Sequence, residues 1–203
     1  MAMLWSPLKL MEFTRLGISD VLLIRPGLFE DERGAFMEVY QARKFAEAGI
    51  ALPFVQDNQS RSRRSVLRGL HYQIRQPQGK LVRVLSGEVF DVAVDLRRPS
   101  PTFGQWASAI LSSENHLMLW VPPGFAHGFY VVSEWAEIGY KATDFYAPKW
   151  ERTLRWDDLA LGIPWPLAAG ASPIVSPKDA TGATLDQCEV YDWAGFPPEA
   201  PQP

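Results

Sequence analysis

A few side chains in this sequence are of types that transfer protons near neutral pH, and His71 is the first. In a strand, His71 and Gln73 would face one way, and Leu70 and Tyr72 would face the other. An imidazole that points into a barrel would be half-buried and suited to general base catalysis. The alternative is a hydrogen-bonded structural histidine, and position alone does not decide between the two.

The other histidines and the single cysteine do not make a recognisable metal site. His127 has Gly124 before it and Gly128 after it, which suits a close approach of backbone or ligand, whereas His116 is typical of a turn. A zinc or iron site needs three or four ligands, and Cys188 stands alone. A metal site therefore stays an alternative, but the sequence offers few residues that could be its ligands.

Anion binding is the second chemistry that the sequence allows. The basic run from Arg61 to Arg68 is either a solvated loop or a phosphate clamp, because guanidinium groups bind phosphate through two hydrogen bonds. Lys80 follows Gly79 before an expected strand and could bind phosphate or stabilise an enolate. Tyr140 could donate a proton or pack in the core. Neither the P-loop nor the dinucleotide-binding glycine pattern is present.

The elements that must position these groups are mostly strands. Apolar alternation and turn residues predict strands over residues 21–24, 36–40, 66–73, 80–85, 88–96, 104–111, 116–121, 129–133 and 136–143. In 88–96 the alternation places Asp91 with Val89 and Ala93. One helix is expected over residues 41–48, ended by Gly49. Strands at this spacing without helices between them predict an antiparallel sandwich or barrel.

Length and composition narrow the class of protein. A chain of 203 residues with 47% hydrophobic and 21% charged residues suits one folded domain. The formal net charge of −3 argues against nucleic acid as a partner. No apolar run approaches the roughly 20 residues of a membrane helix, and a lone thiol favours the cytoplasm. We expect an extension over residues 1–12, a domain over 13–186 and a Pro-rich tail over 187–203.

Several longer motifs, in one order along the chain, resemble those of the dTDP-4-dehydrorhamnose 3,5-epimerase family. They span about Thr14 to Asp186 and are found at residues 56–58, 66–73, 78–83, 87–95, 100–104, 123–129 and 140–143. The resemblance implies an all-β, cupin-type antiparallel jelly-roll barrel with short peripheral helices. It also implies a homodimer to which N-terminal strands contribute across the interface, and no metal or other cofactor.

The reaction that the resemblance implies inverts C3 and C5 of a dTDP-4-keto-6-deoxyhexose. Both carbons lie next to the C4 ketone, so the loss of either proton forms an enolate. By resemblance, His71 is the base and Asp179 is the carboxylate that orients it. Tyr140 is the acid on the opposite face of the sugar, and Lys80 is the cation near the enolate oxygen.

The resemblance also implies a set of residues that bind the substrate. Its members are polar or charged side chains dispersed along the chain: Arg33, Glu38, Gln56, Asp57, Asn58, Arg68, His127, Glu151 and Lys178. Gly139, beside Tyr140, stands where a larger apolar residue is common in the family. This difference leaves open an epimerase that acts at C3 or C5 alone.

Two other classes of function stay in view. One is a metal-dependent cupin such as an oxygenase, and the other is a binding module for sugar nucleotides that has no catalytic activity. The combination of His71, Tyr140, Lys80 and Asp179 argues against the second class, because a binding module needs no acid–base set.

Overall fold

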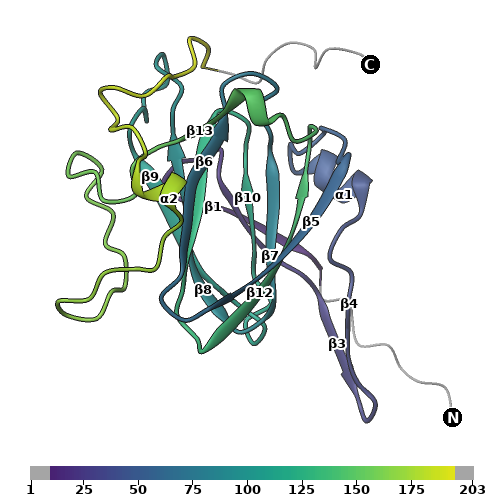
Figure 1. Ribbon diagram of the computed structural model, residues 1–203. Helices are drawn as coiled ribbons and strands as arrows, with labels where there is room; N and C mark the ends of the chain where they lie inside the picture. Colours follow the sequence, from purple (N-terminus) through teal and green to yellow (C-terminus); the bar gives the residue numbers. More distant parts are fainter. Residues whose placement is uncertain (1–9, 195–203) are drawn as a thin grey trace, which may run out of the picture.

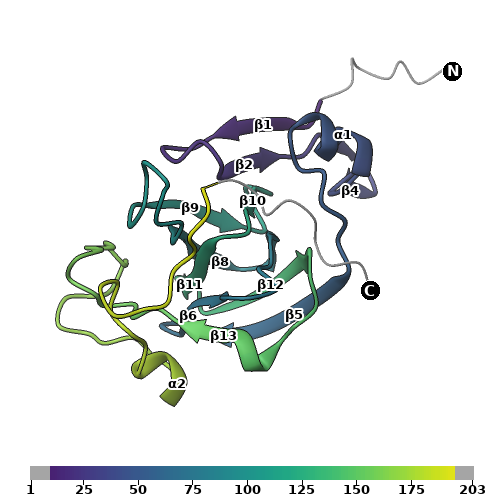
Figure 2. The same cartoon turned by 90° about the horizontal axis from the view of Figure 1, so that it is seen from above.

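The computed structural model describes residues 10–194, in which two antiparallel sheets face each other (Figure 2). The first sheet consists, in pairing order, of β1 (Glu12–Arg15), β2 (Leu22–Arg25), β10 (Met118–Val121), β7 (Lys80–Ser86), β12 (Trp135–Ala142) and β5 (Gln56–Arg63). The second consists of β13 (Glu151–Thr153), β6 (Leu67–Gln73), β11 (Phe125–Val131), β8 (Glu88–Asp95) and β9 (Trp106–Ser112). The other elements are β3 (Leu28–Asp31), β4 (Gly34–Met37), α1 (Ala42–Glu47), the 3₁₀ turn η1 (Pro148–Trp150) and α2 (Pro177–Ala180).

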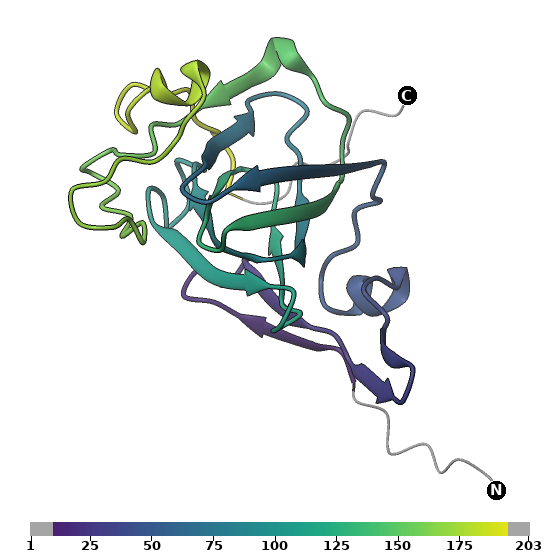
Figure 3. The same ribbon diagram turned by 60° about the horizontal axis from the view of Figure 1, so that its bottom comes forward.

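The predicted all-β class with short peripheral helices is confirmed, and some predicted boundaries need correction. The strand expected over residues 36–40 ends at Met37 and belongs to a hairpin with β3, which projects from the barrel (Figures 1 and 3). Strand β5 is not predicted from the sequence, because it has no apolar residue and therefore no hydrophobic alternation. Its inner face carries Asn58, Ser60 and Ser62 instead.

The two ends of the chain fall partly outside the described residues. Strand β1 begins at Glu12, so the expected N-terminal extension is ordered strand at its last residue. Residues 1–9 and 195–203, which include most of the expected extension and of the Pro-rich tail, lie outside the described range. No helix within residues 10–194 is long and apolar enough to cross a bilayer.

The predicted helix is confirmed as α1, and its ends have local causes. The Gln41 side chain accepts a hydrogen bond from the Lys44 backbone N–H at 2.9 Å, which caps the first turn. Gly49 has a φ of +93°, a conformation that favours glycine and ends the helix. Phe45 is buried against β2 and β10, so the helix covers the outer face of the first sheet.

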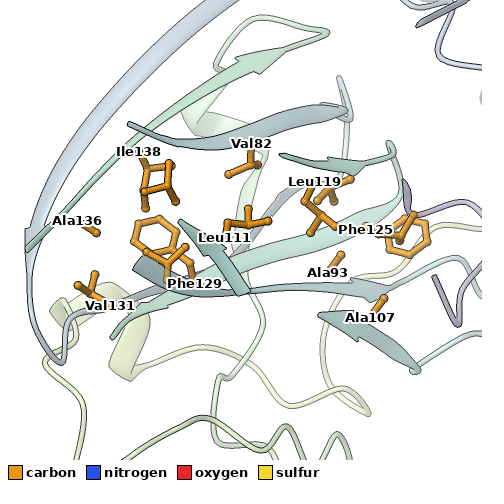
Figure 4. Packing of buried hydrophobic residues seen from close by; sticks show 14 of the residues in the cluster. Val82, Ala93, Ala107, Leu111, Leu119, Phe125, Phe129, Val131, Ala136 and Ile138 are labelled. Atoms are coloured by element: carbon orange, nitrogen blue, oxygen red, sulfur yellow. The ribbon is translucent and has the colours of Figure 1, made fainter. Parts of the chain in front are cut away.

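The core lies between the sheets and follows the two-residue alternation of the strands. Val82 and Ile138 from the first sheet meet Ala93 and Phe129 from the second (Figure 4). Val92 and Val94 face the other way, into a second cluster that the segment after β13 covers. The alternation predicted for residues 88–96 is thus confirmed, with Asp91 on the inner face beside Ala93.

Glycines bring β6 and β11 unusually close together. A Cβ atom on Gly69 would lie 2.6 Å from Gly128 Cα, and a Cβ atom on Gly128 would lie 2.6 Å from the Arg68 carbonyl oxygen. The glycines beside His127 were expected to allow a close approach of backbone or ligand, and the approach is that of another strand, β6. It holds the two strands that carry His71 and His127 in fixed register.

The core makes a direct prediction about stability. Leu119 is fully buried between the sheets, so Leu119→Ala should lower the free energy of unfolding by about 2–5 kcal/mol. Leu159 is 96% exposed, and Leu159→Ala should change that free energy by less than about 0.5 kcal/mol. Denaturant unfolding of both variants checks this, and equal losses would contradict the assignment of the core.

Candidate active site

The inner faces of the two sheets carry several of the ionisable groups that were singled out from the sequence, among them His71, His127 and Tyr140. His71 on β6 is directly opposite His127 on β11, and His127 is opposite Ala93, a residue of the inner core. On the facing sheet, Tyr140 is opposite Val82, which also belongs to that core. Residues opposite each other in an antiparallel pair share a face, so these side chains point between the sheets.

The predicted partner of His71 is in place. His71 Nε2 and Asp179 Oδ1 are 2.5 Å apart, and Asp179 is buried whereas the His71 side chain is 28% exposed. Burial alone would raise the pKa of the Asp179 carboxyl, but its hydrogen bond to His71 and the charge of His71 lower it. An ionised Asp179 orients the ring and leaves its second nitrogen to exchange a proton.

Local sequence fixes Asp179 on α2. Ser176 caps this short helix by accepting the Asp179 backbone N–H at 3.1 Å, and Pro177 occupies the first turn, where its missing N–H has no consequence. Residues 177–180 therefore form a helical turn. That turn brings the carboxylate to a histidine 108 positions earlier in the chain.

A second histidine–carboxylate pair lies deeper between the sheets. His127 Nε2 is 2.9 Å from Asp91 Oδ1, and both side chains are buried. The other carboxylate oxygen of Asp91 has no hydrogen-bond partner among the described residues. A buried carboxylate oxygen without a partner is energetically costly, and a polar group of a bound ligand would remove that cost.

Lys80, the first residue of β7, is the cation of the site. Its Nζ atom donates to the His71 carbonyl oxygen at 3.4 Å. Burial lowers the pKa of Lys80 to about 8, and the negative charges of Glu151 and Asp91 only partly oppose this effect. The ammonium group therefore remains largely charged at neutral pH and titrates just above it.

Tyr140 and Arg68 approach the same region from opposite sheets. Burial is the main cause that raises the pKa of Tyr140, with Glu151 adding to the increase and Arg68 opposing it. The Tyr140 hydroxyl thus keeps its proton at neutral pH and can donate it. Arg68 Nε donates to Ser62 Oγ at 3.0 Å, and Arg68 points inward, whereas Arg61 and Arg63 face outward along β5.

Glu151 on β13 gathers three groups at the edge of the site. It forms an ion pair with Lys178 at 2.6 Å and accepts a hydrogen bond from the Tyr146 hydroxyl at 2.8 Å. Although burial opposes the change, these two contacts lower the pKa of Glu151. The charge of His71 also lowers the pKa of Glu151. On β13, Glu151 is opposite Gln73, which lies two residues after His71 on β6.

The remaining predicted binding residues divide into two groups. Gln56 and Asn58 bond to each other at 2.9 Å, and Asn58 is opposite Tyr140. Asp57 lies between them on the outer face of β5, where it pairs with Lys141 at 2.7 Å. Its side chain therefore does not join the inner cluster, because neighbouring residues in a strand face opposite ways.

Arg33 and Glu38 lie away from the inner cluster of their own chain. Arg33 is at the exposed tip of the β3–β4 hairpin, where it pairs with Asp31 at 2.5 Å. Glu38 follows that hairpin and pairs with Lys44 of α1 at 2.6 Å. A single chain thus does not bring these two residues to His71.

Two residues beside the predicted ones were missed by sequence reasoning. Asp91 could have been found from the alternation of 88–96, which already placed it on the inner face. Tyr146 carries no such signal, because it lies in the loop after β12, outside any hydrophobic alternation. Its hydroxyl meets Glu151, five residues later, across the turn η1. Within residues 10–194, no group of three or more His, Cys, Asp or Glu residues is arranged to hold a metal ion.

A histidine bonded to a buried carboxylate, with a protonated tyrosine and a lysine on the facing sheet, defines an acid–base enzyme built in a jelly-roll barrel. Comparison with known proteins identifies the family within this class of enzymes. Residues 15–187 match the family model described as dTDP-4-dehydrorhamnose 3,5-epimerase. The chain belongs to this family of carbohydrate epimerases.

Relatives and solved structures agree with the family match. A dTDP-4-dehydrorhamnose 3,5-epimerase of Pseudomonas aeruginosa is 57% identical over 182 residues, which cover 89% of this chain and 99% of the relative. The crystal structure of a Legionella pneumophila 3,5-epimerase in complex with dTDP-4-keto-L-rhamnose has a TM-score of 0.87 and 49% identity, covering 91% of this chain and 100% of that one.

A third comparison concerns a structure with other ligands. The Bacillus anthracis dTDP-4-dehydrorhamnose 3,5-epimerase with TDP and PPi bound has a TM-score of 0.82 and 41% identity. The match covers 86% of this chain and 99% of that chain. The predicted cupin-type fold and family are therefore confirmed.

The lowered pKa of Lys80 predicts how activity depends on pH. As the pH rises through about 8, the ammonium group loses its proton, so a reaction that needs this cation should slow with a midpoint near that value. Tyr140 stays protonated over this range, because its pKa is raised. Arginine keeps its charge at these pH values.

The measurement is the pH profile of kcat for wild type and Lys80→Arg. The variant should be slower, because a guanidinium group has a different shape, but it should lack the decline near pH 8. A decline with the same midpoint in both proteins would assign that titration to another group.

Proposed function

We propose that the chain inverts C3 and C5 of dTDP-4-dehydro-6-deoxy-D-glucose by general acid–base catalysis. The observation that carries the proposal is the His71–Asp179 pair on one inner face, with Lys80 and Tyr140 on the other. The product would feed dTDP-L-rhamnose synthesis. A cytoplasmic location would fit the single cysteine, which is free.

In this proposal the free ring nitrogen of His71 takes the proton from C3 or C5. The electron pair of the broken C–H bond moves toward C4, and negative charge collects on the carbonyl oxygen. The Lys80 ammonium stabilises that enolate. Tyr140 then returns a proton to the opposite face of the same carbon, which inverts it, and both groups recover their protonation states by exchange with solvent.

Substrate binding would involve the charged groups around this centre. Arg68 and Lys178 are cations suited to the diphosphate. His127 and the unpartnered oxygen of Asp91 are polar groups suited to hydrogen bonds with sugar hydroxyls. Glu151, Gln56 and Asn58 would complete the polar lining, with no metal required.

The first test follows proton exchange in D₂O by NMR, with dTDP-4-dehydro-6-deoxy-D-glucose as substrate. Deuterium should enter at both C3 and C5, because the enolate returns a solvent-derived proton to each carbon. His71→Ala should slow exchange by about 10²–10⁴-fold, the usual contribution of one positioned acid or base. Binding of dTDP, measured by calorimetry, should change little.

Other outcomes of this test have separate meanings. Deuterium at one carbon only would indicate a single-position epimerase with the same mechanism. Full exchange in His71→Ala would remove His71 as the base. A wild-type protein that binds dTDP without any exchange would indicate a binding module, and activity that is lost to a chelator and restored by iron would favour a metal-dependent cupin.

We further propose that the active form is a homodimer, and the outer face of the first sheet supports this. A groove of about 200 Å³ on this face is lined in part by Leu81, Leu85, Met118 and Gly139. The projecting β3–β4 hairpin exposes Phe36, which would be covered in a dimer. Arg33 and Glu38 would then reach the site of the partner.

Light scattering after size exclusion tests the dimer, which should have twice the chain mass of 22.8 kDa. Leu85→Glu places a charge on the proposed interface and should give monomers with weakened dTDP binding. Ile110→Glu is the matched control, because Ile110 is similarly exposed (41% against 38%) but lies on β9. Wild-type monomers, or equal effects of both variants, would contradict this interface.

A further inference from the structure

Gln73, the last residue of β6, is a buried polar residue to which the mechanism gives no role. It is 3% exposed, lies two residues after His71 on the same face, and is opposite Glu151 on β13. We propose that Gln73 is a positioning residue whose side-chain amide fixes the loops around the acid–base site. This inference rests on the proposed function, because it concerns the efficiency of that reaction.

The Gln73 amide joins two loops that are far apart in the sequence. Its Nε2 group donates to the Gln76 carbonyl oxygen at 2.7 Å and to the Phe145 carbonyl oxygen at 3.2 Å. Its Oε1 atom accepts the Ala147 backbone N–H at 2.7 Å. Both N–H groups of the amide are therefore used, and a side chain without an amide could not replace these bonds.

Each of these loops leads to a group of the site. Phe145 and Ala147 flank Tyr146, whose hydroxyl bonds to Glu151 and whose backbone N–H donates to Gln56 Oε1 at 2.8 Å. The other loop runs from Gln76 to Lys80, the cation of the site. The buried Gln73 side chain thus connects β6, which carries His71, to two loops by hydrogen bonds. One loop carries Tyr146, and the other precedes Lys80.

The backbone of Gln73 is held from the opposite side by the C-terminal segment. The Tyr191 hydroxyl donates to the Gln73 carbonyl oxygen at 2.5 Å, and Tyr191 is itself buried. Burial raises the pKa of Tyr191, so this donor keeps its proton throughout the working range. Tyr191 lies beyond residues 15–187, the part of the chain that matches the family model.

The hydrogen bonds of Gln73 would affect the rate through the positions of the reacting groups. A displacement of reacting groups by about 1 Å can cost about 10²-fold in rate, even when its source lies outside the chemistry. Loss of the amide would free the two loops from β6 while leaving His71, Lys80 and Tyr140 chemically intact. The expected effect is therefore a lower kcat and weaker substrate binding, without a change in which groups titrate.

Gln73→Met tests this role, because methionine is of similar length and forms none of these hydrogen bonds. The kcat/KM for deuterium incorporation should fall about 10–100-fold, with part of the loss in kcat. The matched control is Gln78→Met, which removes a similar bond to the Asp144 carbonyl oxygen at 2.8 Å but leaves both neighbours of Tyr146 bonded to Gln73. The control should remain within about threefold of wild type.

Two further measurements cover the case in which Gln73→Met does not fold. In the wild type, the Ala147 N–H should be protected from hydrogen exchange, because it donates to a buried oxygen. Tyr191→Phe removes only the hydroxyl that holds the Gln73 carbonyl and should lower kcat. Tyr72→Phe is its control, since it removes a comparable bond to the Glu189 carbonyl oxygen on the other face of β6.

The outcomes are distinguishable. A folded Gln73→Met protein with wild-type kcat and KM, a rapidly exchanging Ala147 N–H, or equal effects of Tyr191→Phe and Tyr72→Phe would overturn the positioning role. An inactive wild type would instead overturn the proposed function. A folded Gln73→Met with reduced kcat, an unshifted pH profile and a near-normal control supports the role.

Discussion

The alternation of side chains along antiparallel strands is the constraint on which this structure depends. The inner face of each sheet must hold the hydrophobic core and also the groups that react with a sugar. Along β8, Val89 and Ala93 are core residues, while Asp91 between them points the same way. A shift of one residue in register would turn every one of these side chains to the opposite face.

Ionisable groups can lie so close to an apolar core because other groups bond to them. Asp179 bonds to His71, Asp91 to His127, and Asp95 to Arg97, and all three carboxylates are buried. An unpaired buried charge would be strongly destabilising. The first two pairs involve histidine, whereas the third involves Arg97, which keeps its charge.

In the Asp95–Arg97 pair, the pairing of a buried carboxylate stabilises the fold. Arg97 also bonds to Asp20, which precedes β2, and to the Ala194 carbonyl oxygen in the C-terminal segment. It therefore ties the β1–β2 connection and the last described residue to the end of β8. The Asp95–Arg97 pair joins separate segments of the fold, whereas the two histidine pairs belong to the candidate active site.

The sequence by itself determined the strand-rich class, the helix over α1, the alternation of 88–96 and, through its motifs, the family and the candidate residues. These features are local or are matched position by position, so they need no knowledge of contacts. Strand β5 could not be predicted, because a strand of polar residues has no hydrophobic period.

Only the tertiary structure decided which candidate residues meet. It brought Asp179 to His71 across 108 positions, turned Asp57 outward and placed Arg33 on a projecting hairpin. It also gave Gln73 its three amide contacts, because long-range proximity depends on strand order and register, which no single segment encodes.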